Sequence, residues 1–425
     1  MSIALGLVPI ALLFAGFPIF IVLLAGASLA LAVFMNMPLS AIHQNLFGAI
    51  NTSGLLAIPY FIFAGELMSR GSVAQRLVSC VGASVKPLPG ALGVTTIGTA
   101  TVFGAISGSS AASVASVGKV MHPAMTNDGY PNHFSAGMII SAGAIGVIIP
   151  PSIPMIVYGA ASETSIPRLY AAGVLPGLLT AALLALYIIW RAKTDGFGSS
   201  GRFSWRHLLD TTRHAVLAIG APVVVLGGIY GGFVSPTEAA ALATVYALLV
   251  TRFAYRELPW GEVLEAAKST VVFTSQILVI VSAAGLFSWV LTINQIPQAV
   301  VAWVVALEVS PWMFLLAINL LLLFIGCFMD PLSAILLLTP ILMPVVNALG
   351  IDPVHFGIVM TLNLAIGLFT PPFGLNIFVA QSALGIKASD IYRGALPFFC
   401  LFILALLLIT FVPSIALTSM NWFLF

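Results

Sequence analysis

The stretch Gly146-Val-Ile-Ile-Pro-Pro-Ser152 has a counterpart later in the chain, Gly367-Leu-Phe-Thr-Pro-Pro-Phe373. Both lie inside long apolar runs in which a helix is expected. A proline has no backbone N–H and clashes with the carbonyl four residues earlier, so each proline pair should break its helix. The breaks should free the carbonyls of Gly146 and Val147 in the first copy, and those of Gly367 and Leu368 in the second.

The composition places these breaks in a membrane protein. Of the 425 residues 60% are hydrophobic and only 7% are charged, whereas about a quarter of an average soluble domain is charged. The net charge of +2 is too small to indicate binding of a nucleic acid. Soluble enzymes, secreted domains and disordered chains are excluded as well. The alternation expected of membrane strands is absent, so we predict an all-α polytopic membrane protein with roughly ten to twelve spans.

The two breaks belong to a larger repeat. An offset of 221 residues, the separation of Gly146 from Gly367, aligns 101–176 with 322–397 without a gap and pairs four prolines and three glycines. Paired repeats with matching interrupted helices are typical of secondary transporters. We expect the two repeats to be inverted, because that is the rule for the fold type.

The charge pattern divides the chain. Eight of the 15 basic residues lie between positions 191 and 268, and basic loops usually face the cytoplasm. We therefore expect a first repeat over 1–195, a cytoplasmic linker over 196–213 and a second repeat over 214–425.

Each repeat also carries a polar interruption before its proline pair. Gly104-Ala-Ile-Ser-Gly-Ser-Ser-Ala-Ala-Ser113 and Gly326-Cys-Phe-Met-Asp-Pro-Leu-Ser333 replace bulky side chains in the middle of apolar runs. A helix broken there would form a re-entrant hairpin lining protein or a wet cavity. The expected elements are hairpins near 95–125 and 315–346, and broken helices over 135–160 and 355–380.

Freed carbonyls in hydrocarbon need a partner. A dehydrated sodium ion ringed by carbonyl and hydroxyl oxygens is one solution, and a kink filled by water or by Ser152 is the alternative. Two kinks at equivalent positions of the two repeats favour two cation sites, one in each repeat. The Ser107, Ser109 and Ser110 hydroxyls could cap the helix after the first interruption and attract a carboxylate, or they could serve close helix packing.

Four residues are candidates for substrate binding: Ser109, Ser152, Asp330 and Phe373. Asp330 is the single acidic residue within these motifs; it could bind a cation or substrate, carry a proton, or cap a helix ahead of Pro331. The chain has no phosphate-binding GxxxxGK[ST] motif, no protease motif and no potassium-filter sequence. ATP is therefore not expected to drive it, and no catalytic residue is predicted.

Five segments in order resemble the large membrane subunit of tripartite ATP-independent periplasmic (TRAP) transporters. They are 104–112, 146–152, 236–241, 326–330 and 367–374. The resemblance implies an elevator-type importer of organic acids in the bacterial inner membrane, driven by two or more sodium ions per cycle and related to the ion transporter superfamily. It also implies two partners, a soluble periplasmic binding protein and a small four-helix membrane subunit that we expect to be a separate chain.

The resemblance implies the ligands of two sodium sites. The first would use Ser107, Ser110, Gly146, Ile149 and Pro150. The second would use Gly326, Gly367, Thr370 and Pro371. Two alternatives stay open at this point: a stand-alone sodium–dicarboxylate symporter or ion antiporter of the same fold, and a non-transporting scaffold subunit of a membrane complex. Dicarboxylates, sialic acids and other carboxylates are all open as substrates.

Overall fold

The computed structural model describes residues 3–35, 37–198 and 201–423, and every regular element in these ranges is a helix. The first ten α-helices are α1 (Val8–Phe14), α2 (Ile19–Leu29), α3 (Leu39–Ile50), α4 (Ala57–Arg70), α5 (Val73–Val85), α6 (Ala91–Ser107), α7 (Ser110–Asn127), α8 (Asn132–Ile148), α9 (Ile153–Ser162) and α10 (Ile166–Asp195). The others are α11 (Trp205–Tyr230), α12 (Pro236–Leu248), α13 (Trp260–Ile293), α14 (Ile296–Ala306), α15 (Pro311–Gly326), α16 (Pro331–Ala348), α17 (Pro353–Gly367), α18 (Leu375–Leu384), α19 (Ala388–Phe411) and α20 (Ser414–Phe423).

Helix bounds recur along the chain. Helices α15 to α19 each begin within one residue of the position reached by adding the 221-residue offset to the start of α6 to α10. The bent pair α3–α4 has the long helix α13 as its counterpart, and α5 has α14. The recurrence extends the repeat well beyond the aligned window of the sequence. Inversion of the two repeats stays a prediction.

The predicted breaks and hairpins appear as separate helices. Helices α8 and α9 meet at an angle of 41° around a cis Pro150–Pro151 bond, and a second cis bond joins Pro371 to Pro372 between α17 and α18. The expected hairpins are the pairs α6–α7 and α15–α16.

The number of long spans is smaller than expected. Among the described residues, six helices are long and apolar enough to cross a membrane, or up to eight when each of two bent pairs counts as one span. Several predicted spans are instead helices of 10–17 residues, because the hairpins and breaks divide the apolar runs that the estimate of ten to twelve spans had counted whole.

The expected linker 196–213 is partly helical. Helix α11 already begins at Trp205, where the Ser204 hydroxyl accepts a hydrogen bond from the backbone N–H of His207. Such an N-cap satisfies a donor that would otherwise be unpaired. The turn between α11 and α12 ends in a capping box, with Ser235 and Glu238 bonded to each other's backbone.

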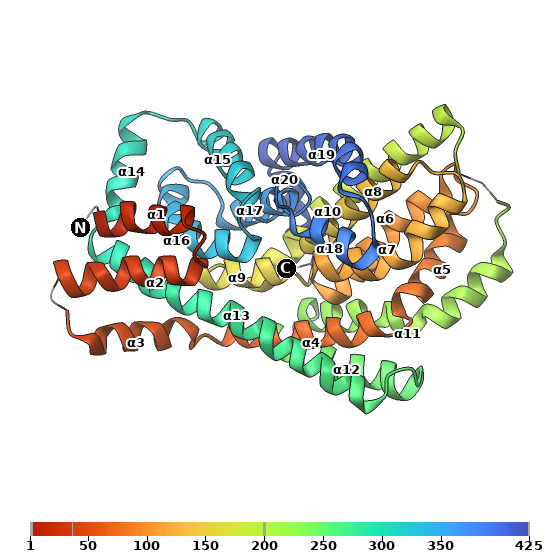
Figure 1. Ribbon diagram of the computed structural model, residues 1–425, viewed down its shortest axis with the longest axis horizontal. Helices are drawn as coiled ribbons and strands as arrows, with labels where there is room; N and C mark the ends of the chain where they lie inside the picture. Colours follow the sequence, from red (N-terminus) through yellow and green to blue (C-terminus); the bar gives the residue numbers. More distant parts are fainter. Residues whose placement is uncertain (1–2, 36, 199–200, 424–425) are drawn as a thin grey trace.

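The hairpins and broken helices form the centre of the molecule. Figure 1 shows α13 running along one side beside α3 and α4, with α12 packed on α4. In the centre the repeats cross over, since α9 packs against α16 and α18 packs against α7. Each broken helix therefore rests on the hairpin of the other repeat.

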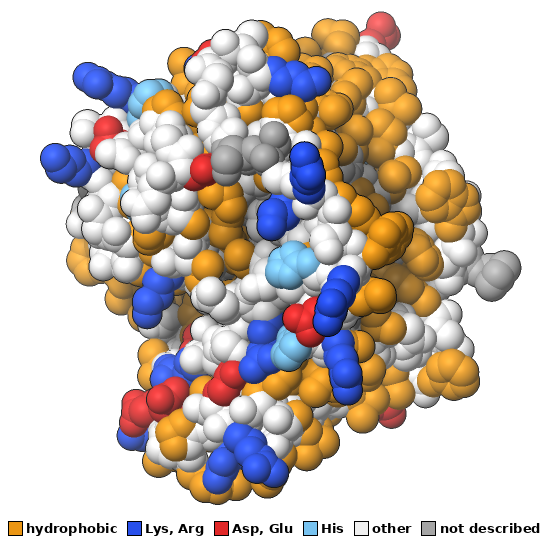
Figure 2. Space-filling model, turned by 90° about the vertical axis from the view of Figure 1, so that its right-hand side faces the viewer, with side chains coloured by type: hydrophobic (Ala, Val, Ile, Leu, Met, Phe, Trp, Pro, Cys, Tyr) orange, Lys and Arg blue, Asp and Glu red, His pale blue; other side chains and the backbone are white. Residues whose placement is uncertain are grey.

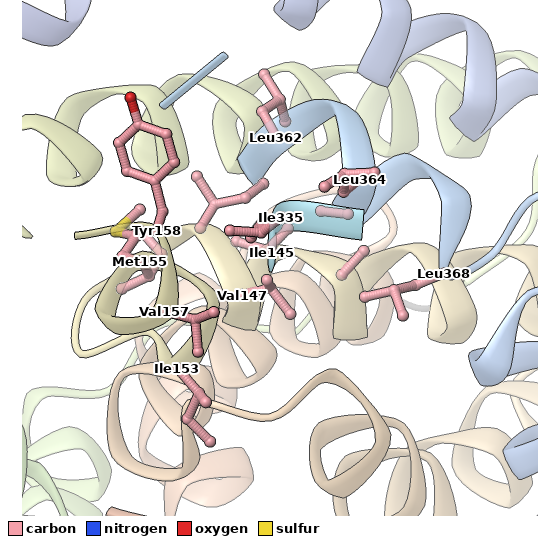
Figure 3. Close-up of a cluster of buried hydrophobic side chains, with 14 of the residues drawn as sticks. Ile145, Val147, Ile153, Met155, Val157, Tyr158, Ile335, Leu362, Leu364 and Leu368 are labelled. Carbon is pink, nitrogen blue, oxygen red and sulfur yellow. The ribbon is translucent and has the colours of Figure 1, made fainter. Parts of the chain in front are cut away.

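A shared apolar core joins the two repeats at this crossing. Figure 3 shows Ile145 of α8, Val157 of α9, Ile335 of α16 and Leu364 of α17 as members of one cluster of buried side chains. All four side chains are buried. Between helices in a membrane, close van der Waals packing replaces removal from water as the stabilising interaction, so this core holds the two breaks in a fixed relation.

Candidate ion and substrate site

The tip of the first hairpin lies directly on the first break. Helix α6 ends at Ser107, Gly108 adopts a left-handed φ of 58°, and the Ser109 hydroxyl caps α7 by accepting from the N–H of Ala112. A Cβ atom on Gly104 would overlap the Cα atom of Gly146. The backbones of hairpin and broken helix therefore touch, which only glycine allows.

Hydroxyl groups surround this contact. A Cβ atom built on Gly146 would lie 3.1 Å from Oγ of Ser113. Ser113 donates to the Ser109 carbonyl at 2.9 Å, and Ser107 and Ser110 are both buried. Ser110 Oγ lies 3.4 Å from the place of a Cβ on Gly143, one turn before Gly146. The structure thus brings Ser110 and Gly146 to one interface, with Ser113 as a member that the sequence had not singled out, whereas the backbone of Ser107 lies against Gly65 of α4.

The freed carbonyls of the first break differ in their partners. The Ser152 hydroxyl donates to the carbonyl of Val147 and accepts from the N–H of Met155. The Val147 carbonyl therefore has a hydrogen-bond donor, as expected for a kink that is filled by Ser152. Among the described residues, the Gly146 carbonyl has no donor, because the N–H of Ile149 bonds to Ile145 and Pro150 has none. Carbonyl and hydroxyl oxygens are the ligands that a hard cation prefers, and this break supplies an unmet carbonyl on a helix whose Gly143 and Gly146 face the hydroxyls of Ser110 and Ser113.

The second break pairs more of its own carbonyls. Leu368 accepts from the N–H of Asn376 at 2.8 Å, and Gly367 accepts from the N–H of Thr370 at 3.3 Å. The Thr370 hydroxyl donates to Ile366, not to the carbonyls that the prolines free. Its oxygen lone pairs stay open. A Cβ atom on Gly367 would overlap the backbone of Gly326, so hairpin and break touch here as in the first repeat.

The residues predicted for the sodium sites differ in exposure. Ile149 and Pro150 are buried with the first break, whereas Pro371 is exposed in the second. Among the described residues no group of three His, Cys, Asp or Glu side chains is placed to hold a metal ion. A cation at either break would therefore be held by neutral oxygens.

The four substrate candidates lie in different surroundings. Asp330 is exposed and caps α16, accepting from the N–H and the hydroxyl of Ser333, which agrees with its interpretation as a cap. Phe373 is 53% exposed and stacks near Phe328 with ring centroids 5.9 Å apart. Ser152 is fully buried in its cap. Ser109 lines a cavity.

That cavity has a volume of about 480 Å³ and lies between the tip of hairpin α6–α7 and helices α4 and α13. Its polar lining consists of Glu66, Ser69, Ser107, Ser109, Ser116 and Ser269. Arg70 stands at its edge, with Nε 3.4 Å from Glu66 and Nη2 donating to Ser269 at 3.2 Å. A cleft of this size suits a small organic ligand, and one wall of it is the hairpin that touches the first break.

Asn376 is, after Ser113, a second residue of this site that the sequence analysis did not identify. It is fully buried at the start of α18, and its side chain accepts from Ser110 at 2.9 Å and donates to the Ile140 carbonyl at 2.7 Å. Its partners lie 266 and 236 residues away along the chain. No local pattern could have indicated either contact.

Comparison with solved structures defines the class. The fold matches the YdaH transporter of Alcanivorax borkumensis with a TM-score of 0.60 at 16% identity, covering 90% of this chain and 87% of that one. It matches MtrF of Neisseria gonorrhoeae with a TM-score of 0.62 at 12% identity, covering 88% and 83%. The chain therefore has the fold of helical membrane transporters.

Sequence relatives narrow the class to one family. Residues 7–415 match the family described as tripartite ATP-independent periplasmic transporter, DctM component. The chain is 41% identical to the C4-dicarboxylate TRAP transporter large permease protein of Pseudomonas aeruginosa over 93% of each chain. It is 39% identical to the ectoine/5-hydroxyectoine large permease protein of Ruegeria pomeroyi over 98% of each.

The chain belongs to the DctM family of TRAP transporter large permeases. It is a multi-pass protein of the inner membrane and a transporter subunit, not an enzyme. A further relative, the isethionate TRAP transporter permease protein of Oleidesulfovibrio alaskensis, is 41% identical over 96% of this chain and 66% of that longer protein.

Proposed function

We propose that this permease takes up a small organic acid anion, with sodium ions as the coupling species. The observation that carries the proposal is that the Gly146 carbonyl has no donor among the described residues, at a residue that packs against Gly104 and faces the hydroxyl of Ser113. Leaving such a group unmet in a buried site costs about 1–3 kcal/mol. A bound sodium ion would recover that free energy. Release of the ion would loosen the contact between the first hairpin and the first break.

The second sodium site would form at the equivalent break. Gly326 and Gly367 touch there through their backbones, and the Thr370 hydroxyl keeps its lone pairs because its proton is used on Ile366. Pro371 supplies a further carbonyl. This site is more exposed than the first, so we expect it to bind sodium more weakly.

The substrate would enter the 480 Å³ cavity beside Ser107 and Ser109. These hydroxyls and the free N–H groups at the start of α7 suit a carboxylate, and Arg70 at the edge offsets the charge of Glu66 in the lining. Dicarboxylates, sialic acids and other carboxylates fit this chemistry. The named relatives carry C4-dicarboxylates, ectoines or isethionate, which supports a small charged organic substrate without selecting one.

Transport would follow an elevator movement. The hairpins and broken helices pack on one another across the repeats and would move together, while α3, α4 and α13 would form the scaffold. The cavity lies between these two groups, where such a movement would carry a ligand. A periplasmic binding protein would deliver the substrate, and a small membrane subunit would complete the scaffold.

Uptake into proteoliposomes tests the coupling. The chain would be reconstituted with its small membrane subunit, and labelled succinate or sialic acid would be supplied with the cognate binding protein. We expect uptake only under an inward sodium gradient. Undiminished uptake in sodium-free medium under a proton gradient alone would overturn the proposal.

A further inference from the structure

Asn376 lies at the point where the two breaks are joined. Its backbone N–H donates to the Leu368 carbonyl in the second break, and its side chain bonds to Ser110 in the first hairpin and to Ile140 on α8. The residue is fully buried. It therefore contacts, at once, a residue assigned to the first sodium site and a carbonyl freed in the second break.

The chemistry of its partners fixes how the amide is turned. The Ile140 carbonyl can only accept, so the NH₂ group of Asn376 must face it. The amide oxygen then faces Ser110, whose hydroxyl must act as the donor in the 2.9 Å bond. A hydroxyl has one proton, and here that proton is used on the amide oxygen. Both lone pairs of Ser110 Oγ stay open to accept or to coordinate.

We propose that Asn376 is a positioning residue that holds the Ser110 hydroxyl in the orientation needed to bind sodium. The inference rests on the proposed function and extends it to a residue of the other repeat. With an apolar side chain at position 376, the Ser110 proton would turn toward other acceptors, such as nearby backbone carbonyls. The hydroxyl would then present its proton to the cation for part of the time and bind it less tightly.

The same residue links the two sites. Because the Asn376 backbone is bonded to Leu368, a shift of the second break moves the amide that orients Ser110. This link exists in one direction only, from Asn376 of the second repeat to Ser110 of the first. At the 221-residue offset, Met155 stands in place of Asn376 and Pro331 in place of Ser110, so the reverse contact does not exist.

Sodium dependence of uptake in the reconstituted complex tests the inference. Asn376→Ala should raise the sodium concentration for half-maximal uptake about tenfold, with a smaller effect on the maximal rate; a tenfold change corresponds to about 1.4 kcal/mol. Ser110→Ala should have a similar effect, and the double variant should be no worse than the worse single one. Asn376→Asp can replace both bonds only when its carboxyl is protonated, donating to Ile140 and accepting from Ser110, so it should raise the half-maximal concentration less than Asn376→Ala does.

A matched control separates positioning from folding. Asn319 is also a buried amide of the second repeat, and it donates to the hydroxyl of Thr410. Asn319→Ala should lower thermal stability in detergent without changing the sodium dependence. If Asn376→Ala lowers stability in the same way but leaves the half-maximal sodium concentration within twofold of wild type, the inference is wrong. A wild-type complex without any sodium dependence would instead overturn the proposed coupling and this assignment with it.

Discussion

At residue scale, two glycines decide whether each hairpin can touch its broken helix. Gly146 and Gly367 pack on the backbones of Gly104 and Gly326 with no side chain between them. Any larger residue must push the hairpin tip away from the break. The hydroxyls and carbonyls proposed to hold sodium come from both sides of this contact, so its separation would open the site.

Gly146→Ala tests that dependence. The new Cβ atom would lie 2.9 Å from the Cα atom of Gly104, a distance at which the backbone must shift. We expect the sodium concentration for half-maximal uptake to rise by at least about tenfold, equivalent to roughly 1.4 kcal/mol. Gly227→Ala on α11 is the control, because a Cβ atom there meets nothing within 4 Å. Equal sodium dependence of the two variants would contradict the close-contact model.

Prediction from sequence worked at residue scale where the cause was local. A proline pair breaks a helix through its own geometry, and Asp330 caps α16 as its position before Pro331 indicated. The partners of the freed carbonyls could not be predicted in the same way. Asn376 reaches the Leu368 carbonyl and Ser110 only after both repeats have packed together.

At element scale, a polar cluster fastens the turn between α4 and α5 to the segment that precedes α13. The Glu257 carboxylate accepts from the backbone and hydroxyl of Ser72 and from Arg76 at 2.8 Å, and Arg76 also stacks on the Tyr255 ring at 3.9 Å. Burial alone would raise the pKa of Glu257, but the hydrogen bonds from Ser72 and Arg76 outweigh it and hold the pKa below 4.5.

This shift predicts a pH dependence of stability. A carboxylate with a lowered pKa in the folded protein stabilises the fold fully above its unfolded value of 4.5 and loses that contribution as the pH falls through the folded value. We expect the difference in thermal unfolding midpoint between wild type and Glu257→Gln to be largest at about pH 6 and to shrink as the pH falls below 4.5. A constant difference across this range would show that the carboxylate charge does not matter.

The bounds of the helices could be predicted from the sequence where glycine and proline interrupt the apolar runs. The predicted hairpins and broken helices agree with α6–α9 and α15–α18 to within a few residues at most of their ends. The number of membrane spans could not be predicted in this way, because apolar content alone does not distinguish a helix that crosses the membrane from a short buried one. The start of α11 was missed because its first turns are polar and basic, as a linker would be.

At the scale of the whole molecule, charge is distributed unevenly. Figure 2 shows basic side chains gathered on the end of the molecule that carries α5 and α11 in Figure 1, next to a broad hydrophobic surface. The basic segments around Arg202 and Arg256 flank the consecutive candidate spans α11 and α12. By the positive-inside rule, we predict that this end faces the cytoplasm.

Cysteine labelling tests that orientation. In a variant whose three native cysteines are replaced by serine, Arg202→Cys and Arg256→Cys should react with a membrane-impermeant maleimide only from the cytoplasmic side. Phe233→Cys should react only from the periplasmic side, because Phe233 is 85% exposed in the turn that joins the two spans. Labelling of Arg202→Cys and Phe233→Cys from the same side would contradict the assignment of α11 as a span.

The one-sided bond between Asn376 and Ser110 has a consequence for the ancestry of the chain. A homodimer of the first half would place Met155 against Ser110, and a homodimer of the second half would place Asn376 against Pro331. Neither pairing can form the hydrogen bond. Two identical halves of either kind would therefore lack this bond, which forms only between the two different halves of this chain.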